Sequence, residues 1–398
     1  MLWKKCAWII RDPPVVDLPD RTWHGVFSAC YEIIYRTKFT EEDREGVTMS
    51  QLDQRIKSIA VIGNHVPRKC GIATFTTHLC DALEQEIPDS ANVIVVALND
   101  VKEGYGYPDR VKFEIRDKVQ TDYLRAAEFL NVSKVDVAIL QHEYGIFGGQ
   151  CGAHVFHLIK NLRMPVLTTL HTVPSNPQGD QKAVLFELGE ISEKIIVMSR
   201  KAREMLTDIY HVGETKIAVV PHGIPDVPFL DPCFFKDQFG LEDRQVILTF
   251  GLLGPGKGIE TMIESMPAIV RRHPNVVYVI LGATHPHVLK AAGEEYRYSL
   301  QQKVQRLNLE KHVLFFNQFL DIQSLIRFLT TADVYVCPYP SKDQVVSGTL
   351  SYAMGVGKAV VSTPFWHAEE ALADGRGILV PFEDPDAMAK GIIELLSS

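Results

Sequence analysis

Hydrophobic residues follow two alternating patterns along this chain from residue 58 onward. Short uninterrupted apolar runs, which are typical of strands buried on both faces, alternate with stretches in which apolar residues recur at helical spacing. Two of the helical stretches carry, in turn, Ile72, Phe75, Leu79 and Leu83, and Val155, Leu158, Ile159 and Leu162. Strands that are separated by helices pair in parallel through right-handed crossovers. The pattern therefore predicts an α/β protein with Rossmann-like sheets.

The alternation occurs twice, which predicts two doubly wound domains. The first series of apolar runs is SIAVIG, ANVIVVAL, VKFEI, VDVAILQ, PVLTTLH, KIIVMS and KIAVVP, and the second is QVILTFG, VVYVILG, VLFFNQ, DVYVCPY, KAVVST and GILVPF. The proline-rich stretch DVPFLDP lies between them and is typical of a linker. We place the first domain at residues 58–226 and the second at residues 227–398. A ligand crevice is expected between them, at the carboxyl ends of the strands.

Residues 1–57 do not share this alternation. Three of the four tryptophans of the chain, Trp3, Trp8 and Trp23, lie in this segment, which also contains the charged run EEDRE. We expect an N-terminal extension that is not part of the core.

Composition narrows the class of partner. The chain has 398 residues, 46% of them hydrophobic, and a formal net charge of −8, which argues against a broad nucleic-acid surface but allows a local basic pocket for a phosphorylated small molecule. The seven cysteines include no C-x-x-C pair, so neither a disulfide framework nor a zinc site is indicated. No apolar run approaches the length of a transmembrane segment. We expect a cytoplasmic protein, and peripheral contact with a membrane is compatible with this sequence.

A glycine-rich loop follows the first strand of the second domain. The apolar run VILTF ends in GLLGPGKG, which contains Lys257, and helical spacing begins at Ile259. Backbone N–H groups at a helix start, beside a lysine, can receive a phosphate or diphosphate. A tight turn with a solvated lysine explains the same residues equally well. The loop is not a Walker A motif, because no serine or threonine follows the lysine, and it lacks the G-x-G-x-x-G order of a dinucleotide fingerprint.

Polar residues also follow other predicted strands, where parallel sheets bind ligands. Gln141, His142 and Glu143 come after VDVAIL, and His171 comes after PVLTTL. Because His142 and His171 end two strands of the same domain, both could face one crevice, which favours a functional role over a structural one. The cluster Gln141-His142-Glu143 either binds sugar hydroxyls or forms a capped loop.

The dipeptide Asp384-Pro385, with Asp386 next to it, resembles a D-x-D metal motif. However, an aspartate followed by proline at the first helical position is what a helix N-terminus requires. We therefore interpret Asp384 as a helix cap, and nothing in the sequence requires a metal.

With these motifs the chain resembles the GT-B glycosyltransferases, in particular the retaining, nucleotide-sugar-dependent enzymes of group 1 (family 4). RKCGIATF is similar to the first glycine loop of that family, with Gly71, and TLHTVP to its donor-sugar histidine, with His171. GLLGPGKG is similar to its G-R-x-x-x-x-K-G diphosphate loop and keeps Gly251, Lys257 and Gly258. The resemblance implies two Rossmann-like domains that face each other across a cleft.

Three positions depart from the family pattern. Leu252 stands where the diphosphate loop has an arginine, so one of two cations is missing. The E-x7-E motif, whose second glutamate usually holds the ribose, aligns with Gln344 and Tyr352. The frame around it, L-x-x-A-M-x-x-G-x-x-V-V-S-T, is intact.

The resemblance implies a hexosyltransferase that moves a sugar from a nucleotide-diphosphate sugar to a hydroxyl of a carbohydrate or another acceptor, with retention. The first domain would hold the acceptor and the second the donor, without a metal or another cofactor. The expected catalytic residues are His171 and Lys257. The expected acceptor-binding residues are Gln141, His142 and Glu143. The expected donor-binding residues are Gly71, Gly251, Lys257, Gly258, Gln344, Ser347, Gly348, Thr349 and Tyr352.

Two alternatives stay open from the sequence. A nucleotide-sugar epimerase can use the same two-domain fold, because fold does not determine function. The lost arginine and the lost carboxylates also allow a sugar-nucleotide binding protein with weak catalysis. Neither the donor base, the sugar, the acceptor nor the oligomeric state follows from the sequence.

Overall fold

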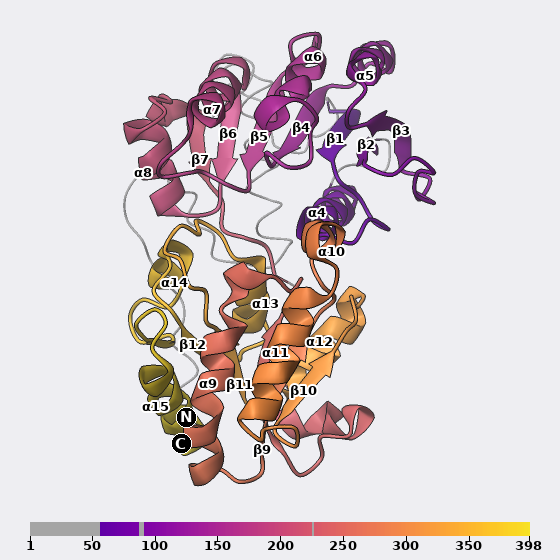
Figure 1. The fold of residues 1–398 in the computed structure, drawn as a ribbon. Coiled ribbons are helices and arrows are strands. Elements are labelled where there is room, and N and C mark those ends of the chain that lie inside the picture. The colour runs from indigo at the N-terminus through magenta and orange to yellow at the C-terminus, as the bar shows by residue number, and fades with distance from the viewer. Residues whose placement is uncertain (1–55, 87–90, 225–226) are drawn as a thin grey trace. The chain divides into compact units, whose positions relative to one another are not determined.

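The computed structural model describes residues 56–86, 91–224 and 227–398. The chain divides into two compact units between Gly223 and Ile224, and each is a parallel α/β sheet with helices around it (Figure 1). This confirms the predicted pair of Rossmann-like domains. The predicted N-terminal extension, residues 1–57, lies almost entirely outside the described residues and stays a prediction.

The first unit contains a seven-stranded parallel sheet in the order β3-β2-β1-β4-β5-β6-β7. Its strands are β1 (Ser58–Gly63), β2 (Asn92–Asn99), β3 (Val111–Arg116), β4 (Val137–His142), β5 (Val166–Leu170), β6 (Lys194–Val197) and β7 (Ile217–Val219). Its helices are α4 (Gly71–Glu86), α5 (Gln120–Val132), α6 (Phe156–Ile159), α7 (Gly179–Ile191) and α8 (Arg200–Asp208), with short 3-10 turns η1 (Gln150–Val155) and η2 (Glu214–Lys216). The strand order reverses between β1 and β4, which is where a doubly wound sheet opens a ligand crevice.

The second unit contains a six-stranded parallel sheet in the order β10-β9-β8-β11-β12-β13. Its strands are β8 (Gln245–Phe250), β9 (Val276–Leu281), β10 (Val313–Phe316), β11 (Val334–Cys337), β12 (Ala359–Ser362) and β13 (Ile378–Leu379). Its α-helices are α9 (Ile259–Arg272), α10 (Pro286–Ala292), α11 (Glu295–Arg306), α12 (Ile322–Thr331), α13 (Gly348–Gly355), α14 (Trp366–Ala371) and α15 (Pro385–Leu396), and its 3-10 turns are η3 (Pro232–Phe239) and η4 (Pro255–Lys257). Here the order reverses between β8 and β11.

Helices cover both faces of the second sheet, as the uninterrupted apolar strands predict. Successive residues of β8 alternate between two cores: Val246 and Leu248 pack on the side of α12, α13 and α14, whereas Ile247 packs on the side of α9, α11 and α15. Helix α15 lies against α9 (Figure 1). Only the ends of the strands are therefore left for polar chemistry.

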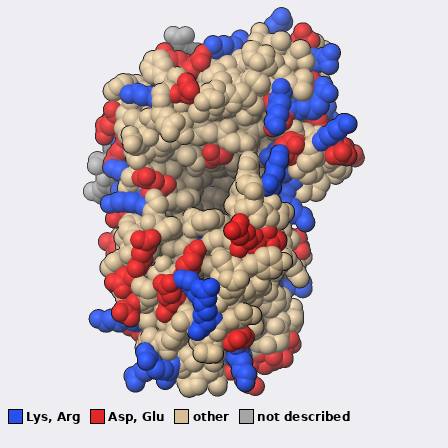
Figure 2. All heavy atoms as spheres, viewed as in Figure 1, with Lys and Arg blue, Asp and Glu red and all other residues tan. Residues whose placement is uncertain are grey.

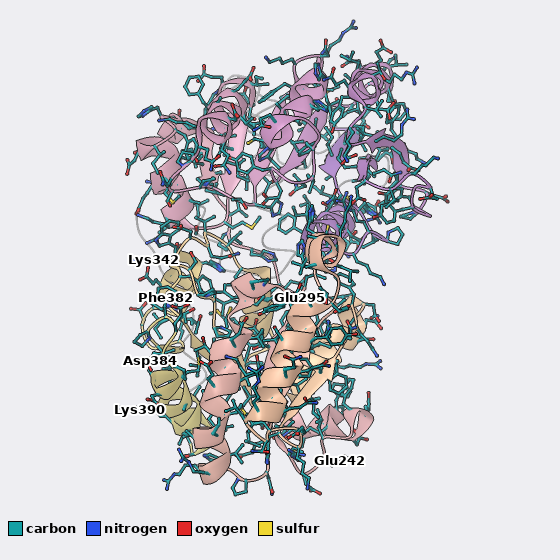
Figure 3. The ribbon with its side chains drawn as sticks, viewed as in Figure 1. Glu242, Glu295, Lys342, Phe382, Asp384 and Lys390 are labelled. Carbon is teal, nitrogen blue, oxygen red and sulfur yellow. The ribbon has the colours of Figure 1, made fainter. Side chains whose placement is uncertain are left out.

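The start of α15 confirms the interpretation of Asp384 as a helix cap. Its Oδ1 accepts a hydrogen bond of 2.9 Å from the backbone N–H of Ala387, and Pro385 is the first helical residue. Figure 3 shows Asp384 at this helix end, with Lys390 further along the same helix.

Charges are distributed over the surface without one dominant sign. On the face that Figure 2 shows, basic and acidic side chains are interspersed over each unit. Among the described residues, no helix combines the length and the apolar character needed to cross a membrane.

Two glycines allow the strand ends of the second unit to approach one another closely. Gly258 has a φ of +63°, and a Cβ there would lie 1.8 Å from the carbonyl oxygen of Pro338. Gly282 has a φ of +155°, and its Cβ would lie 1.8 Å from the carbonyl oxygen of Gly251. No residue with a side chain fits either place without moving the backbone. These contacts bring the loops that follow β8, β9 and β11 together.

We predict that Gly258→Ala destabilises the protein by more than about 1 kcal/mol, because it adds both an unfavourable backbone conformation and a clash with Pro338. Gly256→Ala is the matched control in the same loop, since a Cβ at Gly256 meets nothing within 4 Å. Chemical denaturation followed by circular dichroism measures both variants. Equal stability of the two would show that the contact between Gly258 and Pro338 is not a constraint.

Candidate functional site

In the second unit, Lys257 lies in the loop that follows β8 and is the last residue of η4. Its Nζ donates a hydrogen bond of 3.0 Å to the Oη of Tyr339 and lies 4.5 Å from the centre of the Tyr339 ring. Burial acts to lower the pKa of Lys257, but the interaction with Tyr339 outweighs it and holds that pKa above its usual value. The ammonium is therefore charged at neutral pH.

The N-terminus of α13 adds hydrogen-bond donors beside this ammonium. Ser347 is the N-cap, and its Oγ accepts a bond of 3.3 Å from the N–H of Leu350. The Oγ1 of Thr349 lies 3.0 Å from the Oη of Tyr339 and 3.2 Å from the Oγ of Ser347. The backbone N–H groups of Gly348 and Thr349 have no acceptor within the described part of the chain. A helix start with unpaired N–H groups and an adjacent ammonium is a site for an anion.

Gly251 permits the loop after β8 to pass this close to α13. Its φ is +126°, and a Cβ there would lie 3.2 Å from the Cγ2 of Thr349. Most of the residues expected to bind the donor are thus brought together by the loops after β8 and β11. They are Gly251, Lys257, Gly258, Ser347, Gly348 and Thr349. Their role in binding stays a prediction.

The two residues at the altered E-x7-E positions lie differently from the rest. Gln344 is exposed, and its Nε2 donates a bond of 2.8 Å to the carbonyl oxygen of Val346, so its side chain turns toward its own loop. Tyr352 is only 6% exposed and belongs to the hydrophobic core on the α12–α14 side of the sheet. The expectation that Tyr352 contacts the donor is not supported by this placement, because its ring is part of the core.

Two further residues of the cluster around Lys257 and the start of α13 were not predicted from the sequence. Tyr339 is 4% exposed and stacks on Phe365, with ring centres 4.9 Å apart, and His367 accepts the backbone N–H of Ser347 at its Nδ1, at 3.0 Å. An aromatic residue after a buried strand has the pattern of a core residue. Only the observed contact with Lys257 reveals that the hydroxyl of Tyr339 has a polar role.

In the first unit, His171 is linked to Gln141 across two neighbouring strands. Gln141 pairs in register with Thr169 of β5, and its Oε1 lies 2.9 Å from the Nε2 of His171. The ring of Phe75, from α4, meets the ring of His171 edge-on at 4.9 Å and that of His222 at 5.3 Å. Gln141 is fully buried, so its side chain is a fixed hydrogen-bond partner for the Nε2 of His171.

Burial lowers the pKa of His171 to about 3, and the neighbouring His222 and His142 lower it further. The imidazole is therefore neutral at physiological pH. A neutral imidazole can accept or donate a hydrogen bond to a sugar hydroxyl, but it does not supply a positive charge.

The position of His142 contradicts the expectation that it faces the same crevice as His171. It is fully buried, stacks on Phe147 with ring centres 5.9 Å apart, and meets Tyr144 edge-on. Neither ring nitrogen has a hydrogen-bond partner in the described residues, and burial lowers the pKa of His142 to about 3. Its ring therefore packs as a core side chain and presents no surface to an acceptor.

Glu143 has the contacts of a capped loop, the second of the two interpretations of this cluster. Its Oε2 accepts a bond of 2.5 Å from the Oγ1 of Thr172, and its Oε1 accepts the backbone N–H of Tyr144 at 2.9 Å. Burial raises the pKa of the Glu143 carboxyl. The bond from Thr172 ties the loop after β4 to the loop after β5.

Gly71 is the exposed first residue of α4, and a Cβ there would meet nothing within 4 Å. The helix is capped by Cys70, whose Sγ accepts the N–H of Ala73 at 3.3 Å. The place of Gly71 at a helix start agrees with the expected contact to a diphosphate, which stays a prediction.

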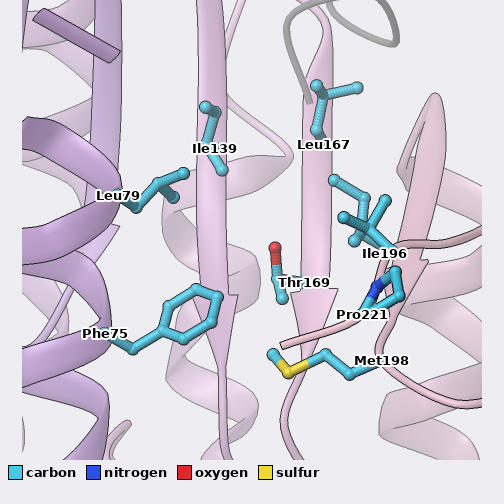
Figure 4. A pocket seen from close by; sticks show the side chains of 9 residues that line it. Phe75, Leu79, Ile139, Leu167, Thr169, Ile196, Met198 and Pro221 are labelled. Atoms are coloured by element: carbon cyan, nitrogen blue, oxygen red, sulfur yellow. The ribbon is translucent and has the colours of Figure 1, made fainter. Parts of the chain in front are cut away.

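A small cavity lies next to this cluster in the first unit (Figure 4). Its volume of about 10 Å³ is the room of about one water molecule. Phe75, Met198 and Pro221 are among its mainly apolar lining, and Thr169 adds a hydroxyl. The cavity is too small for a sugar.

Both units match family models of known proteins. Residues 234–398 match the family model described as glycosyl transferases group 1, and residues 70–226 match the one described as glycosyltransferase family 4. An uncharacterized glycosyltransferase of Methanocaldococcus jannaschii is 27% identical over 67% of this chain and 68% of its own length. The phosphatidyl-myo-inositol mannosyltransferase of Mycolicibacterium smegmatis is 29% identical, but over 44% of this chain and 42% of its own length.

Solved structures show the same fold. Sucrose-phosphate synthase of Thermosynechococcus elongatus has a TM-score of 0.66 at 18% identity, with 86% of this chain and 90% of that chain covered. Anabaena HepE, in complex with UDP and glucose, has a TM-score of 0.65 at 16% identity, with 85% and 90% covered. The two units therefore have the GT-B fold.

The buried His142 predicts a dependence of stability on pH. Its pKa is about 3 in the folded protein and about 6.5 in the unfolded chain, so below pH 6.5 the unfolded chain binds more protons and stability falls. The loss is about 1.4 kcal/mol for each pH unit between about 6.5 and about 4. His142→Phe keeps a ring against Phe147 and should remove the contribution of His142 to the pH dependence of the free energy of unfolding. Chemical denaturation of both proteins at pH 7, 6 and 5 tests it, and parallel curves would contradict it.

Proposed function

We propose that this chain is a group 1 glycosyltransferase, as its matches to two glycosyltransferase family models indicate, and that it moves a sugar from a nucleotide-diphosphate sugar to an acceptor hydroxyl with retention of configuration. The second unit would hold the donor and the first the acceptor. No side-chain nucleophile is needed if the acceptor attacks from the face that the leaving group departs from. The protein would then act by positioning and charge stabilisation.

The observation that carries this proposal is the convergence of donors at the start of α13. The Lys257 ammonium, the hydroxyls of Ser347 and Thr349, and two unpaired backbone N–H groups all meet at the switch point between β8 and β11. A diphosphate gains negative charge as it leaves the sugar. Donors fixed at the place where that charge develops stabilise the transition state more than the ground state.

His171 would contact the donor sugar or the leaving group as a neutral hydrogen-bonding residue. The Gln141 side chain orients its ring through the Nε2 atom, and Phe75 limits its rotation from the other side. A fixed neutral imidazole can select one hydroxyl of a sugar without adding charge to the site.

A second candidate is a nucleotide-sugar binding protein with weak turnover. One observation favours it: Tyr352 is in the core and Gln344 turns to its own loop, so no carboxylate replaces the usual ribose contact at these positions. The family matches give no support to an epimerase. Incubation with donor alone, followed by nuclear magnetic resonance of the sugar, separates epimerisation from transfer.

The first experiment is a thermal-shift screen of the full chain against UDP-sugars and GDP-sugars. Donors that stabilise the protein are then incubated with mono- and disaccharide acceptors, and release of UDP or GDP is measured. The anomeric signal of the product distinguishes retention from inversion. Binding without release over the whole acceptor panel would favour the second candidate, and no binding at all would contradict both.

We predict that Lys257→Ala weakens donor affinity about 10- to 100-fold, since a charge-assisted contact contributes about 1.5–3 kcal/mol. Leu252 offers no compensating charge in the same loop. The matched control is Lys390→Ala, because Lys390 is exposed on α15 and lies outside the cluster (Figure 3). Titration calorimetry with the best donor measures both variants. Unchanged affinity of Lys257→Ala would refute a diphosphate site at this loop.

A further inference from the structure

Tyr339 lies at the centre of the strand-end cluster in the second unit. Its Oη is within 3.0 Å of the Nζ of Lys257, 3.0 Å of the Oγ1 of Thr349 and 3.4 Å of the Oγ of Ser347. The Lys257 ammonium also lies over the Tyr339 ring, 4.5 Å from its centre. One side chain thus contacts the cation, the N-cap and a hydroxyl of the proposed donor site.

Resting on the proposed function, we propose that Tyr339 is a positioning residue that holds the Lys257 ammonium in front of α13 for the donor diphosphate. Its hydroxyl anchors the ammonium by a hydrogen bond, and its ring anchors it by a cation–π contact. Tyr339 acts on the donor through Lys257 and Thr349.

The ring of Tyr339 is itself immobilised. It is 4% exposed and stacks on Phe365, with ring centres 4.9 Å apart and planes at 30°. Phe365 is fully buried in the core of the unit. A lysine side chain has four rotatable bonds and loses rotamer entropy when it is fixed. A rigid partner that fixes it before the donor binds removes this cost from binding.

The Lys257 ammonium fixes the direction of the hydrogen bonds that the Tyr339 hydroxyl makes. An ammonium only donates, so the Oη of Tyr339 accepts from Lys257 and its own hydrogen must point elsewhere. Thr349 is the nearer of the two remaining oxygens. When Thr349 accepts this hydrogen, its own O–H is directed away from Tyr339, toward Ser347 or an incoming phosphate oxygen. The network therefore orients hydrogen-bond donors toward the helix start.

This arrangement gives a reason why one cation can suffice in this loop. With Leu252 in place of an arginine, the loop offers a point charge and no planar fork. The ammonium has three N–H groups, and one is used by Tyr339. Two N–H groups of an oriented ammonium remain for phosphate oxygens.

A double-mutant cycle tests whether Tyr339 acts through Lys257. Affinity for UDP and for GDP is measured by calorimetry for the wild type, Tyr339→Phe, Lys257→Ala and the double variant. Tyr339→Phe keeps the ring and its stacking but removes the hydroxyl. We expect about 5- to 10-fold weaker binding in the wild-type background and less than about 2-fold change in the Lys257→Ala background. With the best donor, KM should rise while kcat changes less.

Tyr278→Phe is the matched control. Tyr278 is fully buried on the opposite side of the same sheet, in the core formed with α9, and its Oη has no hydrogen-bond partner in the described residues. The same loss of a hydroxyl there should leave UDP and GDP affinity unchanged. Tyr339→Leu, which removes the ring as well, should bind more weakly than Tyr339→Phe if the cation–π contact contributes.

The outcomes separate the inference from the function on which it rests. If the wild type binds UDP or GDP and Tyr339→Phe binds equally well, the inference is overturned and the proposed function is not. If Tyr339→Phe loses the same factor with and without Lys257, Tyr339 does not act through the lysine, and the inference is also overturned. If the wild type binds neither nucleotide nor any nucleotide sugar, both fail. Melting temperatures of all variants identify any loss that is due to unfolding.

Discussion

Burial of both faces of each parallel sheet is the constraint on which the rest of the structure depends. In the second unit, β8 contributes alternate side chains to two separate apolar cores, so neither face has room for polar chemistry. The strand ends are the remaining place, and there the sheet can bring loops close only where a backbone has no side chain. Gly251, Gly258 and Gly282 meet that requirement. The position of the candidate donor site is thus a consequence of how the core is closed.

The two units present different electrostatics at their strand ends. Lys257 keeps its charge because Tyr339 offsets the effect of burial on its pKa. His171 loses its charge because burial lowers its pKa to about 3, and its Nε2 lies beside the neutral amide of Gln141. A charged lysine suits an anionic leaving group, whereas a neutral imidazole suits the hydroxyls of a sugar. The division fits the proposed roles of the second and first units.

The sequence predicts the fold and the place of the second-unit cluster well, because periodicity and glycine position report directly on backbone requirements. It predicts side-chain orientation poorly. His142 and Gln141 are neighbours at the end of one strand. However, Gln141 is hydrogen-bonded to His171, whereas His142 stacks on Phe147 in the core. Tyr339 has the sequence context of a core aromatic residue, and only its three polar neighbours distinguish it. Such distinctions depend on tertiary contacts that no local pattern contains.

The altered E-x7-E positions change how a donor would be held. A carboxylate in the core place of Tyr352 would be costly to bury without a partner, and the tyrosine instead adds apolar contact to the α12–α14 side of the sheet. Gln344, at the other position, donates one amide N–H to the carbonyl oxygen of Val346 in its own loop. If the proposed function holds, these two positions offer no carboxylate to the nucleoside of the donor. In that proposal the phosphate contacts contribute a larger share of the donor's binding free energy, and the geometry around Lys257 becomes the main determinant of donor affinity.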